Sequence, residues 1–167
     1  MAPLAWHFEV NPNSCGNPVH YSDYLKFSAW PDLVSGKDTT HVLCEMQDGK
    51  RVKILAYVTL KASSFLSQND EGKTLGFPAL EISELAVASG HERQGLGSLM
   101  VKHAILCVYE LRQTQLGIQY LVLRADPEAV DFYKKCEPKF GEISENFDEV
   151  PCEEWNTNCV PMYIKLS

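Results

Sequence analysis

A short turn built on Gly95 and Gly97 limits what this chain can fold into more than any other feature of its sequence. Before the turn, residues 80–88 have the length and apolar composition of a central β-strand, although two glutamates lie within it. After the turn, apolar residues recur every three or four positions from Leu96 to Leu111, which predicts an amphipathic helix. A strand, a glycine turn and a helix in this order direct several main-chain N–H groups at one place, where the positive end of the helix dipole also favours an anion. The sequence therefore predicts an anion-binding site at the start of this helix.

Other sequence patterns predict an α/β fold around this site. Asp48-Gly49 is a typical hairpin turn between two expected strands, and strands alternate with helices in the C-terminal half. We therefore expect one domain over residues 1–167, with a mixed, mostly antiparallel central sheet flanked by helices. The other expected elements are strands at 41–47, 52–60, 120–125 and 160–166, short helices between residues 21 and 34 that Pro31 interrupts, and a helix that begins at Asp126-Pro127-Glu128 and ends at Pro138.

Two segments lack a regular pattern. Residues 1–19 contain three prolines and a glycine, which predicts an irregular start of the chain with a short edge strand at 6–10. Residues 67–74 are polar, so we expect a loop there that Pro78 ends.

The acidic charge of the chain narrows the partners that it can bind. It has 22 Asp and Glu residues against 15 Lys and Arg residues, for a formal net charge of -7. This charge disfavours nucleic acid and anionic membrane surfaces, and it is compatible with a cationic amine.

The six cysteines do not have the spacing of a metal site. No pair forms Cys-x-x-Cys and no His-x-x-x-His pattern accompanies them, so we expect no metal centre. The N-terminus lacks a basic start followed by a long apolar run, and no stretch approaches 18 apolar residues. We therefore expect a cytoplasmic protein with reduced thiols and no membrane segment.

The glycine turn differs from two common phosphate-binding motifs. A Walker loop needs Gly-Lys-Ser/Thr, which does not follow here, and Met100 stands where a dinucleotide-binding fingerprint has its third glycine.

Two motifs at a matching separation instead resemble the GNAT superfamily of acetyltransferases. The first is Leu85-Ala86-Val87 with the turn Gly95-Leu96-Gly97, and the second is Ala125-Asp126-Pro127-Glu128-Ala129-Val130-Asp131-Phe132-Tyr133. The resemblance covers residues 80–140, which would form the acetyl-CoA-binding core. It implies a GNAT fold and an acetyl-CoA-dependent N-acetyltransferase, with a homodimer as a common assembly.

The resemblance also implies roles for the matching residues. Leu85-Ala86-Val87 would bind the pantetheine arm through its backbone, where the strand diverges from residues 120–125. Tyr133 would protonate the leaving thiolate of the coenzyme. The other coenzyme-binding residues would be Asp126 and the pyrophosphate loop Arg93, Gln94, Gly95, Leu96, Gly97 and Ser98.

One residue of the loop departs from the family pattern. The family usually has Gln or Arg three residues before the first glycine, whereas this chain has Glu92. A carboxylate close to a diphosphate is unfavourable unless it points outward, so the direction of this side chain bears on coenzyme affinity.

The attacking amine must lose a proton to a base. Glu81 matches the base of the histone-modifying branch of the family and shares a strand face with Leu85. Glu84, on the opposite face, and an ordered water are the alternatives. Tyr21, Tyr24 and Trp30 are candidates for an acceptor pocket or for core packing, and His103 is expected to be a hydrogen-bonded structural histidine.

The sequence leaves three functions open. The first is acetyl transfer to a primary amine of a small molecule or peptide, by direct attack in a ternary complex. The second is acetylation of aminoacyl-tRNA, because the motifs are also similar to toxin-type members of the family, although the acidic charge makes nucleic acid an unfavourable partner. The third is a non-catalytic acyl-CoA-binding module.

Overall fold

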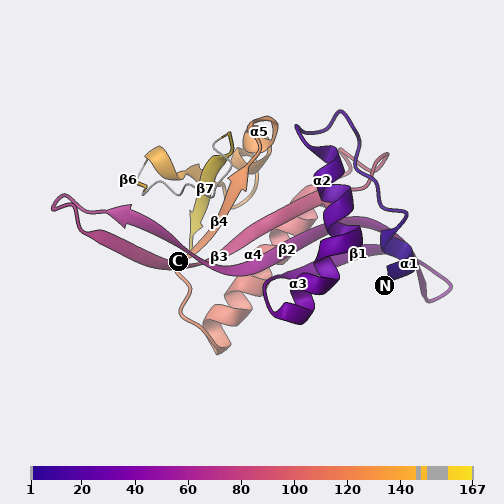
Figure 1. The fold of residues 1–167 in the computed structure, drawn as a ribbon, viewed down its shortest axis with the longest axis horizontal. Coiled ribbons are helices and arrows are strands. Elements are labelled where there is room, and N and C mark those ends of the chain that lie inside the picture. Colours follow the sequence, from indigo (N-terminus) through magenta and orange to yellow (C-terminus); the bar gives the residue numbers. More distant parts are fainter. Residues whose placement is uncertain (1, 146–147, 150–157, 167) are drawn as a thin grey trace. The chain divides into compact units, whose positions relative to one another are not determined.

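The computed structural model describes residues 2–145, 148–149 and 158–166, and it divides the chain into two compact units. The first unit comprises Met1–Lys61 and Ser83–Ala104, and the second comprises Ala62–Ile82 and Ile105–Ser167. Each unit has a hydrophobic cluster of its own. Three long elements continue from one unit into the other, namely β2 (Lys50–Gln68), β3 (Thr74–Val87) and α4 (Leu96–Thr114) (Figure 1).

The strands form a seven-stranded sheet in the order β1-β2-β3-β4-β7-β5, and β6 pairs with β2. β3 and β4 are parallel, whereas the pairs β1–β2, β2–β6, β4–β7 and β5–β7 are antiparallel. This arrangement confirms the predicted α/β class with a mixed, mostly antiparallel sheet. The shorter strands are β1 (Thr39–Gln47), β4 (Tyr120–Ala125), β5 (Gly141–Glu142), β6 (Asp148–Glu149) and β7 (Val160–Lys165).

The predicted irregular start of the chain is present at residues 6–17, but helical segments lie on either side of it. These are α1 (Ala2–Ala5), α2 (Pro18–Asp23), the π-helix η1 (Tyr24–Ser28) and α3 (Ala29–Ser35). The helices expected between residues 21 and 34 are therefore present, but Pro31 does not interrupt them. It lies in the first turn of α3, where a missing N–H costs no intrahelical hydrogen bond.

The edge strand predicted at residues 6–10 is absent from this described segment. The amides of His7 and Phe8 donate back to the carbonyls of Leu4 and Ala5, at 3.3 Å and 3.1 Å, and so close α1. The next bound amide, that of Val10, donates to the hydroxyl of Ser22 at 3.0 Å. The prediction was wrong because the amides of His7, Phe8 and Val10 find partners in helices, while the carbonyl of Glu9 accepts from Ser89, which lies after the end of β3.

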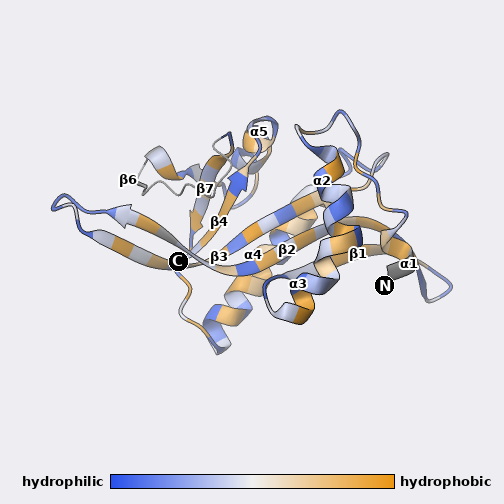
Figure 2. Cartoon of the chain, in the orientation of Figure 1, coloured by the Kyte–Doolittle hydropathy of each residue, from blue (hydrophilic) through white to orange (hydrophobic). Residues whose placement is uncertain are grey.

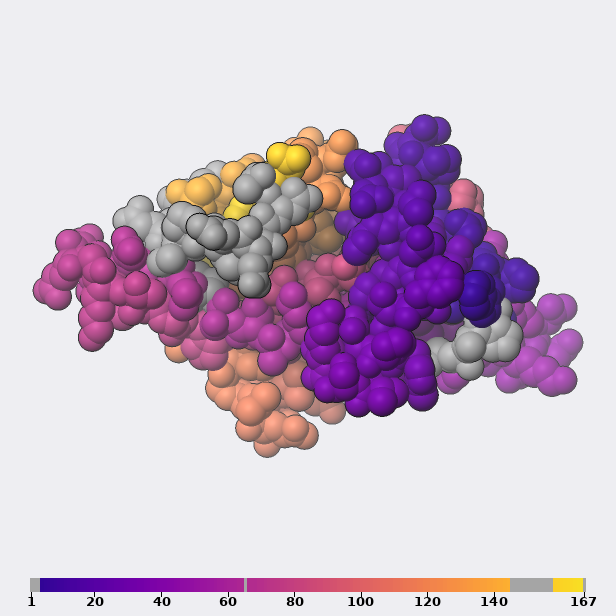
Figure 3. Space-filling model, in the orientation of Figure 1, coloured from indigo at the N-terminus to yellow at the C-terminus, as the bar shows by residue number. Residues whose placement is uncertain are grey.

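Aromatic rings form the centre of the first unit's hydrophobic cluster. The ring of Tyr57, on β2, is fully buried and lies 5.4 Å from that of Phe8 and 6.2 Å from that of Tyr24, measured between centroids. Ile54 and Ala86, from β2 and β3, belong to the same cluster. The cluster thus attaches the N-terminal helices to the strands of the first unit. Figure 3 shows residues 18–35 at the surface of this unit, where Phe27, Trp30 and Val34 are exposed.

β2 and β3 are longer than predicted, with 19 and 14 residues. The expected loop at 67–74 shrinks to residues 69–73, because the side chain of Asn69 accepts hydrogen bonds from the amides of Glu71 and Lys73 and builds a tight polar turn (Figure 2). Pro78 does not end a loop but lies within β3, one residue before the parallel pairing with β4 begins at Ala79. A proline is tolerated at such a position because no ladder hydrogen bond to β4 is lost.

α4 confirms the helix predicted after the glycine turn. Its buried residues are Met100, Val101, Ala104, Ile105 and Val108. Leu99 was expected on the apolar face but is 49% exposed, so the buried face of the helix does not include it. The spacing of apolar residues predicts that the segment is an α-helix. It does not decide which side of the helix is buried, because apolar residues also lie beside the buried face. Within the described residues, no helix has both the length and the hydrophobicity needed to cross a bilayer.

The second unit is built on β4, which starts and ends at the predicted residues. β4 pairs with β3 from Ala79↔Tyr120 to Ile82↔Leu123 and with β7 on its other side. After β4 the chain forms a short 3-10 helix, η2 (Pro127–Ala129), and then α5 (Val130–Lys134). This helical segment ends earlier than the predicted boundary at Pro138.

Candidate functional site

The loop between β3 and α4 is held in place by main-chain hydrogen bonds. After Val87, the amide of Ala88 donates to the carbonyl of Leu55 at 2.8 Å, and the amide of Ser89 donates to the carbonyl of Glu9 at 2.7 Å. These bonds fix the start of the loop to β2 and to the N-terminal segment. Its geometry is therefore set by the first unit itself.

Two residues in the left-handed region turn this loop into α4. Gly95 has φ +80°, and Arg93 has φ +58° although it carries a side chain. Space is open around Gly95, where an added Cβ would meet no atom within 4 Å. The helix begins at Leu96, and the amide of Leu99 donates to the carbonyl of Gly95 at 2.9 Å.

The first amides of α4 have no hydrogen-bond acceptor within the helix. The N–H groups at the start of a helix, here those of Leu96, Gly97 and Ser98, have no carbonyl one turn earlier within the helix. They point along the helix axis at its positive end, so an anion is favoured there. The predicted pyrophosphate residues 93–98 thus form one continuous turn and helix start in the structure.

Glu92 folds back on its own loop. Its Oε2 accepts a hydrogen bond from the amide of Gly90 at 2.9 Å. Hydrogen bonds from its own amide, from the side chain of Asn11 and from Gly90 hold the pKa of this carboxyl below its usual value. The carboxylate therefore serves as an acceptor for an amide of its own loop. Next to it, Lys53 donates to Nε2 of His91 at 2.8 Å.

Residues 85–87, the stretch expected to bind the pantetheine arm, form the end of β3 in the first unit. In this stretch Ala86 is buried, and Leu85 and Val87 are half-buried.

Glu84 on β3 and His20 on α2 form a hydrogen-bonded pair that the sequence analysis did not foresee. Nε2 of His20 lies 2.9 Å from Oε1 of Glu84, and the side chains are 48% and 14% exposed. Burial raises the pKa of the Glu84 carboxyl above its ordinary value, although the hydrogen bond and charge of His20 oppose this rise. Asn17 caps α2 by accepting from the amide of His20 at 3.3 Å and so fixes the base of that side chain.

Electrostatic interactions link Glu84 to Asp38, Lys61 and Tyr57 within the first unit. The negative charge of Asp38 adds to the rise in the pKa of Glu84, and the positive charge of Lys61 lowers it. Burial raises the pKa of Tyr24 to about 12, and its hydroxyl donates to Oδ2 of Asp38 at 3.4 Å. The hydroxyl of Tyr57 donates to the carbonyl of Tyr21 at 2.9 Å. This half-buried acidic environment suits a cationic amine.

An apolar cavity of ≈ 310 Å³ also lies in the first unit. Its wall includes Trp30 and Leu33 from α3, Leu25 from η1, and Val42 and Ile54 from the strands. Of the three aromatic residues considered for an acceptor pocket, only Trp30 lines this cavity, while Tyr21 and Tyr24 pack against the hydrophobic cluster.

The second unit holds the other predicted catalytic residues. Glu81, on β3, is half-buried, and its Oε2 accepts a hydrogen bond from the hydroxyl of Ser63 at 2.9 Å. Tyr133, on α5, is buried against the ring of Phe140, with 5.5 Å between the centroids. The side chain of Asp126 makes no capping hydrogen bond to η2, and it accepts one from Sγ of Cys159 at 3.7 Å.

Comparisons with known proteins agree with this arrangement. A family model described as the acetyltransferase (GNAT) family matches residues 6–137. No curated protein sequence matches the chain.

Several solved structures share its fold. The structure of a bacterial toxin has a TM-score of 0.71 at 21% identity, over 99% of this chain and 84% of the toxin. An AtaT mutant toxin bound to the C-terminus of the antitoxin AtaR and acetyl-CoA has a TM-score of 0.67 at 21% identity, over 95% and 86% of the two chains. AtaT complexed with acetyl-methionyl-tRNAfMet has a TM-score of 0.69 at 19% identity, over 94% and 85%. Since the family model spans most of the sequence and the glycine loop has the geometry of an anion site, this chain belongs to the GNAT family of acetyltransferases.

Proposed function

We propose that this acetyltransferase moves the acetyl group of acetyl-CoA to a primary amine by direct attack in a ternary complex. The observation that carries the proposal is the turn at Gly95, which opens α4 with amides that have no acceptor within the helix. A diphosphate matches such a group of amides in charge and in hydrogen-bonding capacity. In this proposal, residues 93–98 bind the pyrophosphate and Leu85-Ala86-Val87 binds the pantetheine arm through its backbone.

The backbone at Gly95 gives a direct test of coenzyme binding. We expect Gly95→Val to weaken acetyl-CoA binding about ten- to a hundredfold, because a β-branched residue is strained by about 1–3 kcal/mol at φ +80° and its side chain would occupy the space that the diphosphate needs. Isothermal titration calorimetry measures the change.

Gly49→Val is the matched control for this substitution. Gly49 has φ +74° and equally open surroundings, but it lies in the turn between β1 and β2. Gly49→Val therefore adds similar backbone strain without changing the loop before α4, and the affinity of this variant for acetyl-CoA should stay unchanged. Equal affinities of the two variants for acetyl-CoA would show that the loop does not bind the coenzyme.

We propose Glu84 as the first candidate for the group that takes the proton from the amine. A carboxylate with a raised pKa accepts a proton more readily than an ordinary one, and His20 keeps Oε1 of Glu84 in a fixed direction. Glu81, which the sequence analysis placed first, becomes the second candidate, and an ordered water is the third. Tyr133 is proposed as the acid that protonates the coenzyme thiolate, on the strength of its place in the family motif.

The matched structures favour aminoacyl-tRNA as the acceptor over the small amine that the sequence analysis placed first. Several of them are toxins, and one is a complex with acetyl-methionyl-tRNAfMet. An α-amino group at the end of a charged tRNA is also a primary amine, so it fits the same chemistry. The net charge of -7 and the acidic surroundings of Glu84 favour the second candidate, a small or peptide amine without nucleic acid.

One experiment separates these acceptors. The protein is incubated with radiolabelled acetyl-CoA and either a pool of aminoacyl-tRNA or a panel of diamines and peptides, while release of free thiol is followed. The tRNA acceptor is supported if the label is found in the tRNA fraction and deacylation releases it as an acetyl-amino acid. The second candidate is supported if the label is found in the amines or peptides of the panel. Binding of acetyl-CoA without thiol release from either set would leave only a non-catalytic acyl-CoA-binding module.

A further inference from the structure

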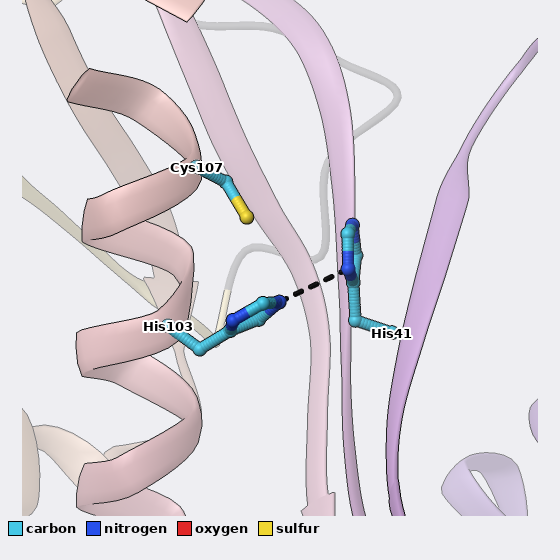
Figure 4. A group of neighbouring side chains, drawn as sticks. All are labelled: His41, His103 and Cys107. Carbon is cyan, nitrogen blue, oxygen red and sulfur yellow. Dashed lines mark hydrogen bonds between the residues drawn. The ribbon is translucent and has the colours of Figure 1, made fainter. Parts of the chain in front are cut away.

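Two histidines, far apart in the sequence, meet in the first unit. His41 lies on β1 and His103 on α4, and Nε2 of His103 is 3.0 Å from Nδ1 of His41 (Figure 4). The ring centroids are 4.8 Å apart with the planes inclined at 62°. A hydrogen bond between two ring nitrogens needs one of them as acceptor, so at least one imidazole is neutral and has a lone pair that can bind a metal.

A thiol lies next to this pair on the same helix. Cys107 is one turn beyond His103 on α4, so the two side chains leave the helix on one face. Its Sγ lies within 4.8 Å of a ring nitrogen of His103, and Figure 4 shows it directed toward the imidazoles. All three side chains are half-buried, which limits competing water but leaves a path for an ion.

The spacing of these groups is close to that of a tetrahedral zinc site. Zn–N bonds of about 2.0–2.1 Å place two ring nitrogens about 3.3 Å apart, and a Zn–S bond of about 2.3 Å places sulfur about 3.6 Å from each nitrogen. The imidazole nitrogens already lie 3.0 Å apart, and Sγ of Cys107 lies within 4.8 Å of them, so a small movement of the sulfur completes the spacing.

We propose that His41, His103 and Cys107 bind a Zn²⁺ ion, with water as the fourth ligand. On binding, the two imidazoles donate lone pairs and the thiol loses its proton to solvent, so that one Zn–S bond forms for each proton released. The ion would tie β1 to α4, the helix that carries the anion-binding loop at its start. Its role is independent of the acceptor, since none of these residues belongs to the proposed transfer site.

Cobalt is the probe for this site, because Co²⁺ takes zinc positions and reports its ligands spectroscopically. Titration of the purified, metal-stripped and reduced protein with Co²⁺ is expected to give a one-to-one complex with a thiolate-to-cobalt charge-transfer band and the visible bands of a tetrahedral ion. One equivalent of Zn²⁺ should remove these bands, and it should raise the melting temperature.

Variants identify the ligands. Cys107→Ser should lose the charge-transfer band, and His41→Asn should weaken Co²⁺ binding at least tenfold. Cys15→Ser, at a half-buried cysteine of the N-terminal segment, should leave the spectrum unchanged. In the wild-type protein, Zn²⁺ should slow the alkylation of Cys107 but not that of Cys15, which mass spectrometry can measure for each cysteine.

Several results would overturn the proposal. These are a wild-type protein that gives no charge-transfer band at a few equivalents of Co²⁺, a band that persists in Cys107→Ser, or equal alkylation of Cys107 with and without Zn²⁺. In any of these cases the two histidines would be a hydrogen-bonded structural pair, as the sequence analysis expected of His103.

Discussion

Replacing Tyr133 by phenylalanine is expected to lower kcat by about 10²- to 10⁴-fold, the range of a lost general acid, while acetyl-CoA binds with unchanged affinity. The ring of Tyr133 is buried against Phe140, and a phenylalanine ring fills the same space. The variant therefore removes the hydroxyl and little else. Single-turnover measurements of thiol release, with calorimetry for the affinity, separate the chemical step from binding.

Tyr120→Phe is the control for this prediction. Tyr120 is another buried tyrosine of the second unit, and its ring lies 5.6 Å from that of Phe77, so its substitution tests the effect of losing a buried hydroxyl in general. Its kcat should stay close to that of the wild type. If both variants kept wild-type turnover, or if both lost it together with coenzyme binding, Tyr133 would have no role as the acid.

Glu84→Gln is expected to lower kcat/KM by about 10²- to 10⁴-fold, because the amide cannot take the proton from the amine. Since the folded protein raises the pKa of Glu84, the wild-type carboxyl becomes protonated, and inactive as a base, at a higher pH than an ordinary glutamate. The acid limb of the kcat/KM profile should therefore lie above the ordinary carboxyl range, and it should disappear from the residual activity of Glu84→Gln. A titrating acceptor amine would give the same limb in both proteins.

Two further variants sharpen this test. His20→Gln removes the hydrogen bond and charge that lower the pKa of Glu84, so the acid limb should move to higher pH while a functional base remains. Glu81→Gln removes the second candidate, whose carboxylate accepts from Ser63. A large loss in Glu81→Gln with little change in Glu84→Gln would assign the base to Glu81 instead.

The part of the site that is local in sequence could be predicted. Gly95, α4 and β4 follow from the spacing of apolar residues, from glycine's access to positive φ and from helix-start geometry, each of which acts over a few residues. The direction of Glu92 was open because it depends on which amide the carboxylate meets, and the structure supplies Gly90.

Contacts between distant segments could not be predicted in the same way. Glu84 was an alternative base in the sequence, but its partner His20 lies 64 residues away and no local pattern links the two. The same holds for His41 and His103, which are 62 residues apart and so escaped a search based on metal-ligand spacing. The full lengths of β2 and β3 were also missed, because Asn69 rather than a proline or glycine alone decides where the turn forms.

In the proposed coenzyme site, the loop before α4 would attract phosphate with amide dipoles, and this has a consequence for the effect of ionic strength on binding. The amide dipoles act over a few ångströms. The net charge of -7 repels a polyanionic nucleotide over a longer range, which added salt shortens to about 8 Å at physiological ionic strength. Moderate KCl should therefore quicken association with acetyl-CoA, as stopped-flow mixing can register, and should weaken the complex less than it would a pocket of lysines.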